Sequence, residues 1–274
     1  MAQFRRYLNL GLLLAAPFLA TAFAASPTVS KTPSIQVSAV WLRGQSGAAD
    51  RELFVAVGDA PPVPLAVGMG SRGRPADIKA GATLRLLAKA DLPPPAKPQA
   101  GAASANAGAS NAAASKPSFV PVGEVPWPAG AGRKALLILA APKDAGGSLR
   151  AMALNDDEEV FPANNVRVVN LTSASLMLRF GQAVKPLPPG PLAPLPYGVK
   201  ADAPGKDPAD IPFALAAGDQ VFFNGFIDPK PQTRVLVLVV PPHSGGKTPF
   251  VQMVRERMPP PPGAAPGNRP PPRS

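Results

Sequence analysis

Short apolar runs with a period of two residues recur along most of the chain. In residues 35–41, every second side chain from Ile35 to Trp41 is apolar, which places these side chains on one side of an extended backbone. The runs are rich in β-branched residues and are bounded by Gly, Pro, Asn or Asp, as is typical of strands. Further runs occupy residues 53–57, 83–87, 135–140, 149–154, 166–171, 176–180, 220–224, 235–240 and 250–254. No window beyond the N-terminus has the 3.6-residue period of an amphipathic helix, so the pattern predicts an all-β sandwich or barrel.

The two halves of the chain share an ordered set of these runs. The matching segments are 53–58 with 176–181, 80–87 with 217–224, and 134–142 with 234–242. Between the second and third matches the first copy is longer, and most of its excess is the segment 92–118, which is rich in Ala, Ser, Pro and Asn. Such a segment offers too few large apolar side chains to offset its ordering entropy. We therefore predict a disordered loop inserted between two strands of the first copy; the competing interpretation, an alanine-rich helix, is disfavoured by its glycines, serines and asparagines.

These observations predict two tandem β-sandwich modules. The first spans residues 34–162 and carries the low-complexity insert 92–118, and the second spans residues 163–257. The tail, residues 258–274, is proline-rich and basic and is predicted to be extended and disordered.

The N-terminus has the three parts of a secretory signal peptide. Arg5 and Arg6 precede an apolar stretch at 8–20, and the Ala-Phe-Ala sequence at 22–24 is a cleavage signal. The apolar stretch is shorter than the ~20 residues that a membrane-spanning helix needs. We expect a signal peptide over residues 1–24 and a periplasmic or extracellular mature chain, with a retained N-terminal anchor as the alternative.

Composition excludes several kinds of site. The 274 residues include 39 prolines, no cysteine and a single histidine, His243. Disulfides, cysteine nucleophiles, zinc–thiolate and iron–sulfur centres are therefore excluded, as is any site that needs two imidazoles. The net charge of +11 suits attraction to an anionic envelope polymer. The aromatic residues do not interleave with Lys and Arg, so no nucleic-acid partner is expected.

Three segments carry residues of chemical interest. The acids from Asp156 to Glu159 raise the question of a calcium site, but adjacent carboxylates diverge on an extended chain and we expect a solvated turn between the modules. His243 and Ser244 are neighbours without the oriented partners of a hydrolase and are expected in a turn. The segment 68–73 lacks the context of a phosphate-binding loop and predicts a flexible hairpin.

Three further residues have alternative interpretations. Trp41 is predicted to lie in the core and not to serve as a sugar-stacking platform. The flanking prolines of Trp127 favour an edge or loop position, where an exposed indole that stacks on a sugar stays an alternative. Asn170 fits the glycosylation pattern but is expected to be incidental. No catalytic, cofactor-binding or metal-binding residue is predicted, no cofactor is expected, and the chain is not expected to be an enzyme.

One segment carries a resemblance to known proteins. The sequence NVRVVNLTS at 165–173, followed by the run 176–180, resembles uncharacterised exported bacterial proteins in which a V-R-F-V-N-L-[ST] strand opens a small immunoglobulin-like sandwich. Asp156-Asp157 and Phe161-Pro162, which precede it, also resemble that group, and the similarity covers roughly residues 134–254. It implies a β-sandwich envelope protein with no known activity and transfers no catalytic or ligand residue. Together with the internal repeat, this resemblance predicts a fold of two tandem immunoglobulin-like β-sandwich modules.

The function predicted from the sequence is that of a non-catalytic binding or structural protein of the cell envelope. Its expected partner is a protein or an anionic envelope polymer, contacted by its surface or by strand pairing at a sheet edge. The alternatives are a hydrolase of envelope polymers and an accessory protein for secretion or surface assembly.

Overall fold

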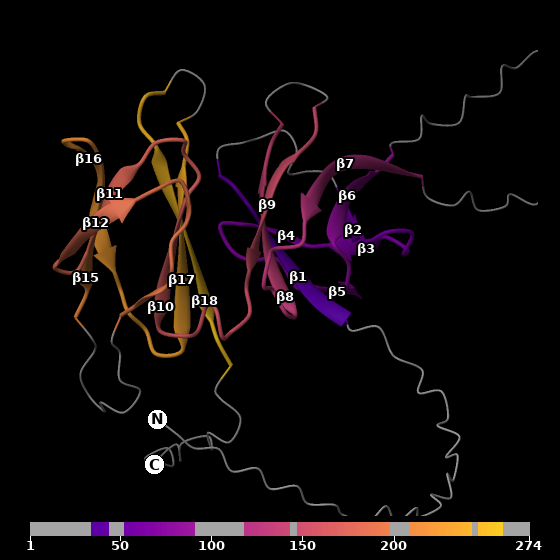
Figure 1. The fold of residues 1–274 in the computed structure, drawn as a ribbon, viewed down its shortest axis with the longest axis horizontal. Coiled ribbons are helices and arrows are strands. Elements are labelled where there is room, and N and C mark those ends of the chain that lie inside the picture. Colours follow the sequence, from indigo (N-terminus) through magenta and orange to yellow (C-terminus); the bar gives the residue numbers. More distant parts are fainter. Residues whose placement is uncertain are drawn as a thin grey trace, which may run out of the picture. The chain divides into compact units, whose positions relative to one another are not determined.

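The computed structural model describes residues 34–43, 52–90, 118–142, 147–197, 209–242 and 246–259 (Figure 1). All regular secondary structure in these residues is β-strand, which confirms the predicted fold class. They include no helix that has the length and hydrophobicity needed to cross a bilayer. The predicted signal peptide at 1–24 lies outside the described residues.

Strands β1 to β9, which we call the N-terminal half, form two sheets (indigo to magenta in Figure 1). Sheet A has the order β4-β1-β8-β9, with β5 also pairing with β1, and sheet B has the order β3-β2-β6-β7. The strands are β1 (Ser34–Trp41), β2 (Leu53–Ala56), β3 (Val63–Leu65), β4 (Val67–Met69), β5 (Ala76–Lys79), β6 (Thr83–Lys89), β7 (Phe119–Pro126), β8 (Lys134–Ala140) and β9 (Arg150–Asn155).

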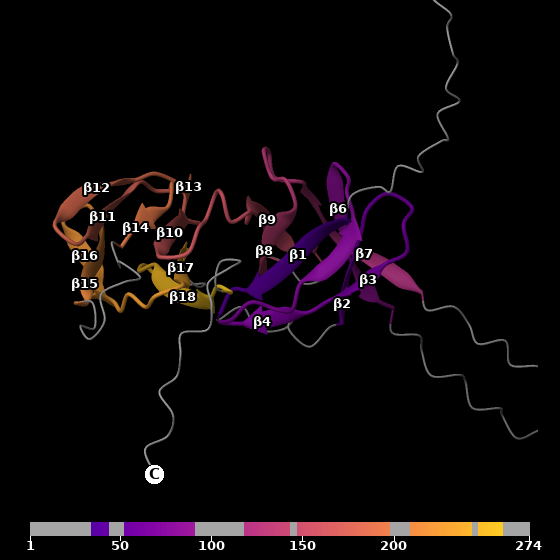
Figure 2. The same ribbon diagram turned by 90° about the horizontal axis from the view of Figure 1, so that it is seen from below.

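Strands β10 to β18, the C-terminal half, also form two sheets (orange to yellow; Figure 2). Sheet C has the order β13-β10-β17-β18, with β14 also pairing with β10, and sheet D has the order β12-β11-β15-β16. The strands are β10 (Asn165–Asn170), β11 (Leu176–Phe180), β12 (Ala183–Leu187), β13 (Gly190–Pro191), β14 (Leu195–Pro196), β15 (Ile211–Ala217), β16 (Gln220–Ile227), β17 (Thr233–Val240) and β18 (Phe250–Arg257).

In each half, every second side chain of the strands points inward and fills a core between the two sheets. The apolar side chains at alternate positions of β1, from Ile35 to Trp41, all belong to the core between sheets A and B, as their spacing predicts. Sheets C and D enclose a second core that includes Leu178, Phe213 and Val237.

The central strands β8 and β17 are apolar on both sides because both of their sides are covered. Leu137 of β8 points into the core of its own half, whereas Leu136 and Ile138 belong to a third cluster that also contains Leu236 and Leu238 of β17. Sheets A and C therefore pack on one another. Continuous apolar runs of this kind are typical of strands buried on both sides.

The contact between sheets A and C uses the matched segments of both halves. Leu136 and Leu236 occupy matched sequence positions, as do Leu154 and Val254, and all four lie in the shared cluster. A buried side chain adds polar contacts: Gln252 of β18 donates to the carbonyl oxygen of Trp41 at 3.0 Å and accepts from the backbone N–H of Arg43 at 2.8 Å. The same surface patch is thus used by both partners, as in an isologous interface.

The two halves share one pairing scheme. Adding nine to each strand number of sheets A and B gives the pairings of sheets C and D, although β1 and β4 are parallel whereas β10 and β13 are antiparallel. The β6–β7 ladder has a bulge between Leu86 and Leu87, and the β15–β16 ladder has one between Leu215 and Ala216. The bulges align β7 with β16 so that residue 121 corresponds to 221.

This alignment corrects one of the sequence matches. The run 80–87 was matched to 217–224, which pairs β6 with β16, but the sheet order makes β15 the counterpart of β6. The error arose because β15 contains Pro212 and was not predicted as a strand. The insert falls between β6 and β7, which pair with one another, and their counterparts β15 and β16 are joined by the turn at Gly218 and Asp219. Residues 91–117 lie outside the described part of the chain.

All ten strands expected from the apolar runs are present, and eight further strands were missed. Six of these eight contain a proline (β3, β7, β12, β13, β14 and β15), which weakens the sequence signal although proline is tolerated at edges and strand starts. The expected tail boundary also changes: Met258 is buried, and its backbone N–H donates to the carbonyl of Gln232 at 2.6 Å.

Candidate functional site

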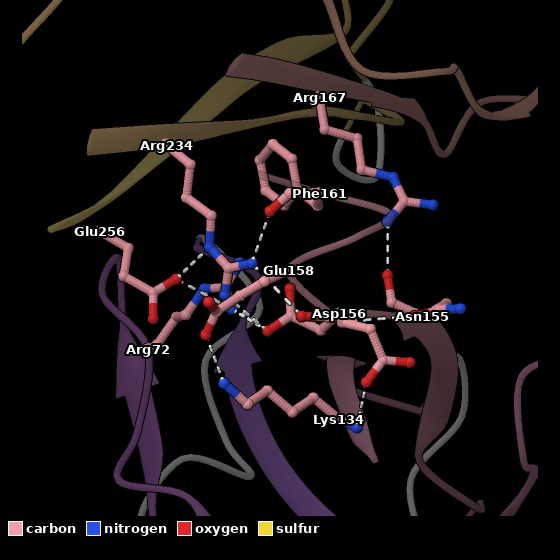
Figure 3. A network of polar contacts seen from close by, with 10 residues as sticks. Arg72, Lys134, Asn155, Asp156, Glu158, Phe161, Arg167, Arg234 and Glu256 are labelled. Carbon is pink, nitrogen blue, oxygen red and sulfur yellow. Dashed lines mark hydrogen bonds and ion pairs between the residues drawn. The ribbon is translucent and has the colours of Figure 1, made fainter. Parts of the chain in front are cut away.

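A buried network of charged side chains lies where the two halves meet (Figure 3). Asp156, which follows β9, is at its centre and is 5% exposed. Its Oδ2 is 2.8 Å from Nη2 of Arg234 at the start of β17, and the same oxygen accepts a hydrogen bond from Arg72. Glu256 of β18 bridges the two cations, at 2.7 Å from Nε of Arg234 and 3.0 Å from Nη1 of Arg72. Two carboxylates thus balance two guanidinium groups.

The loop after β4 brings Arg72 into this network. Gly70 has φ +77°, and a Cβ at Gly73 would lie 1.8 Å from the carbonyl oxygen of Ala66. Side chains at these positions would strain or displace the backbone, so glycine is needed on both sides of Arg72. The segment 68–73 is therefore a tightly packed loop between two strands that each pair with β1, and the predicted flexible hairpin is wrong.

Phe161 and Arg167 complete the network on the side of the C-terminal half. The guanidinium of Arg234 lies 5.0 Å from the centre of the Phe161 ring and donates to the Phe161 carbonyl at 3.0 Å. Arg167 lies over the same ring at 5.9 Å and donates to the Asn155 carbonyl at 2.6 Å. Burial lowers the pKa of Arg167, and the nearby Asp156 opposes that shift.

The charged groups of the network are paired with one another around a small cavity. A cavity of about 140 Å³ beside it is lined by Arg72, Lys134, Asp156, Glu158, Arg234 and Glu256, among others. Asp156 and Glu256 are each paired with guanidinium groups, and Glu158 is paired with Lys134 at 2.7 Å. The hydrogen bond from Lys134 lowers the pKa of Glu158, which favours its charged form.

The four acids of residues 156–159 diverge, as the sequence predicts for adjacent carboxylates, but the first of them is not solvated. Asp156 is buried in the network, Asp157 points to backbone N–H groups, Glu158 pairs with Lys134, and Glu159 is exposed. Across the described residues, no group of three or more His, Cys, Asp or Glu side chains is arranged to hold a metal ion. The expectation of a solvated turn is wrong for Asp156 because two arginines distant in sequence surround it.

Asp157 is a backbone cap whose removal has a predictable effect. It accepts hydrogen bonds from the N–H groups of Gly132, Arg133 and Lys134 at 2.5–2.9 Å. Burial acts to raise its pKa, but these three donors and the charge of Lys134 together lower it. We expect Asp157→Ala to lower the free energy of unfolding by about 1–2 kcal/mol in urea titrations at pH 7.

The pH dependence of the free energy of unfolding tests whether the charged carboxylate of Asp157 is the cause of this stabilisation. Because the pKa of Asp157 is depressed in the folded state, its contribution is present above the unfolded pKa of about 3.9 and is lost as the pH falls through the folded value. The difference between wild type and Asp157→Ala should therefore shrink below about pH 4. A difference that stays constant down to about pH 2.5 would refute the carboxylate's role as a charged acceptor.

The remaining residues singled out in the sequence are structural or undescribed. Trp41 is 2% exposed in the core, as predicted. Trp127 directly follows the edge strand β7, as predicted, but its indole is half-buried against the same core and donates to the carbonyl of Ala131 at 3.1 Å. The side-chain amide of Asn170 is 1% exposed and donates to two backbone carbonyls. His243 and Ser244 lie outside the described residues.

The outward side of sheet D is the candidate binding surface, and we call it the D surface. Strand registers place ten residues on it: Met177, Arg179, Val184, Pro186, Pro212, Ala214, Ala216, Val221, Asn224 and Phe226. Four of them are large apolar side chains that are 39–62% exposed, and Arg179 is the one charged member. At ~4.8 Å between strands, the surface is about 15 Å across. Outward positions of a sheet that faces water are normally polar, so the apolar side chains there make this surface a candidate for interaction.

The corresponding side of sheet B is built differently. Its registers bring together Arg85 of β6 and Glu124 of β7. Its aromatic side chains cover one another, since Phe54 and Phe119 stack edge to face with ring centres 4.8 Å apart. The outward apolar surface is thus a property of sheet D and not of the shared pairing scheme. The sequence signal was weak, because two of the four strands, β12 and β15, contain proline and were not predicted.

A cavity of about 1,040 Å³ lies beyond the end of β16. It is lined by Asp210, by residues 228–233 and by residues 255–257 at the end of β18. Asp228 pairs with Lys230 at 3.2 Å and with Arg255 at 3.3 Å, and the hydrogen bond from Lys230 is the main cause of its lowered pKa. The lining contains no histidine, and its carboxylate–cation pairs suit recognition of charge more than acid–base chemistry.

Comparison with known proteins finds no family model that matches the chain and no curated protein that resembles it significantly.

Proposed function

We propose that this is an exported, non-catalytic binding protein of the cell envelope that docks a partner protein on the D surface. We also propose that its halves are tandem immunoglobulin-like modules, residues 34–162 and 163–257, in a periplasmic or extracellular chain. The observation that carries the proposal is the set of exposed apolar side chains at outward positions of sheet D, namely Met177, Val184, Val221 and Phe226. The signal-peptide pattern at the N-terminus supports export.

The difference between the outward sides of sheets B and D supports this proposal. The outward side of sheet B carries charged residues, and sheets A and C cover each other. The D surface is left as the large apolar sheet surface of the described residues that no other sheet covers. Burying side chains such as Val184 and Phe226, which are each 62% exposed, is worth about 1–2 kcal/mol apiece.

Site-specific photo-crosslinking in intact cells tests the docking surface. We expect a photoreactive residue at position 184 to form a discrete adduct, and Phe226→Ser to lower the yield of that adduct roughly tenfold because an apolar contact is lost. Position 120 provides the matched control, since Val120 is 49% exposed on β7 of sheet B. Equal adducts from positions 120 and 184, or a yield that is insensitive to Phe226→Ser, would contradict docking on the D surface.

A further inference from the structure

The edge strand β16 lacks the protection that its counterpart β7 has. Each pairs with a single neighbour, β15 and β6 respectively. The aligned bulges place Pro121, Glu124 and Pro126 of β7 at the positions of Val221, Asn224 and Phe226 in β16. Proline and charged side chains stop an edge strand from pairing with another strand. Strand β7 has two prolines and one glutamate at these positions, and β16 has neither residue type there.

The other edge of sheet D is also protected, which leaves β16 as the exception in this sheet. Strand β12 contains Lys185 and Pro186. Strand β16 is eight residues long, contains neither proline nor a charged residue, and has three phenylalanines. A long apolar edge without such features is a template for strand addition.

A hydrogen bond that closes the N-terminal half cannot form in the C-terminal half. The backbone N–H of Leu149, just before β9, donates to the carbonyl of Val122 in β7 at 2.6 Å and joins the edges of sheets A and B. The β8–β9 and β17–β18 registers make Pro249 the counterpart of Leu149, and the aligned bulges make Phe222 the counterpart of Val122. Proline has no N–H to donate. No backbone hydrogen bond of this kind joins β16 to the residues before β18 in the described chain. The carbonyl side of β16 is left open at this point.

The charges around this opening indicate what fits it. Along β18 and the residues before it, Lys247, Arg255 and Arg257 are exposed, whereas Glu256 is turned toward the buried network. A strand added to β16 would place one row of side chains beside the D surface and the other row toward β18. Complementarity therefore requires apolar residues in the first row and acidic residues in the second.

A second copy of the same strand fits less well. Antiparallel pairing of two β16 strands about their centre would place Asp219 of each copy opposite Asp228 of the other. Like charges directly opposite one another destabilise a strand pair. The β16 sequence also contains no acidic residues that could lie opposite the cationic side chains of β18.

We propose that β16 accepts an extended segment of another protein as an added strand, and that this segment alternates apolar and acidic residues. The inference rests on the proposed docking function and specifies its partner. The backbone of β16 supplies hydrogen bonds, the D surface contacts the apolar row, and Lys247, Arg255 and Arg257 contact the acidic row.

Peptide binding to the intact mature chain tests this proposal. The probe is an end-capped nonapeptide of alternating valine and glutamate, with two controls: the same peptide N-methylated at alternate residues, and a valine–lysine version. The N-methylated peptide keeps the charge and side chains of the probe but loses its backbone donors. We expect calorimetry to show binding of the valine–glutamate peptide, at least roughly tenfold weaker binding of the N-methylated form, and no binding of the lysine form.

The protein variant for the same test is Val221→Pro. Pro121 occupies the equivalent position in β7, so the fold accommodates proline there, and the substitution removes one N–H from the open edge. We expect at least a roughly tenfold loss of peptide affinity with an unchanged unfolding midpoint. Should that midpoint fall, Asn224→Glu provides a second test: it introduces the residue type of Glu124, the equivalent position in β7, and places a charge on the D surface beside the apolar row of the added strand.

The outcomes separate this inference from the docking function. Equal affinity for the plain and N-methylated peptides, no binding up to about 1 mM, or full affinity in both edge variants would overturn strand addition. Crosslinking from position 184 would still report docking on the D surface in those cases. Concentration-dependent dimers that Val221→Pro abolishes would overturn the assignment of another protein as the partner and favour a second copy of this chain. Equal binding of the lysine peptide would overturn the requirement for acidic residues in the added strand.

Discussion

Replacing Asp156 with alanine is expected to lower the free energy of unfolding by about 3–5 kcal/mol, because it leaves Arg72 and Arg234 buried with too little negative charge. Their side chains are 8% and 3% exposed, so both guanidinium groups depend on buried partners for most of their charge compensation. Glu256 still contacts both arginines, but one carboxylate cannot balance two guanidinium groups. Urea unfolding at pH 7 measures the change.

A double variant distinguishes an unpaired charge from a lost contact. In Asp156→Ala/Arg234→Met both partners are removed, and the penalty should be smaller than the sum of the two single penalties. Lys230→Ala is the exposed control: its side chain is 65% exposed and pairs with Asp228, so we expect a change below about 1 kcal/mol. A loss below about 1 kcal/mol in Asp156→Ala would show that the network does not stabilise the joint.

Truncating either of two matched leucines at the contact between the halves is expected to destabilise the whole chain. Leu136 and Leu236 are each 1% exposed and lie in one apolar cluster. Leu136→Ala and Leu236→Ala should each cost about 2–5 kcal/mol, because a cavity remains where the side chain was removed. Differential scanning calorimetry should show one transition that moves as a unit in both variants.

This prediction decides whether the halves unfold independently. If they did, Leu136→Ala would split the thermal transition and lower only the part that belongs to the N-terminal half. Because the two residues belong to one cluster, the double variant should also deviate from additivity. Val120→Ser, at an exposed position of β7, should leave the free energy of unfolding within about 0.5 kcal/mol of wild type.

The sequence contains the information for the all-β fold class and for ten of the strands, since a two-residue apolar period is a local property. Trp41 could be assigned to the core because its neighbours at alternate positions are apolar. The matched segments 53–58 and 176–181 also proved to be equivalent strands, β2 and β11, because each keeps its position in the sheet order. Strands that contain proline, such as β7 and β15, could not be recognised because their pairing partners compensate for the missing donor.

Two features are set by the tertiary structure alone: the buried charge network and the surface on which the proposed docking depends. Asp156 is buried because Arg72 and Arg234, from distant parts of the chain, converge on it, and no local pattern encodes that meeting. The D surface exists because sheets A and C cover one another whereas the outward side of sheet D leaves Val184 and Phe226 exposed. A local pattern specifies which side of a strand is apolar; whether another sheet covers that side depends on long-range packing.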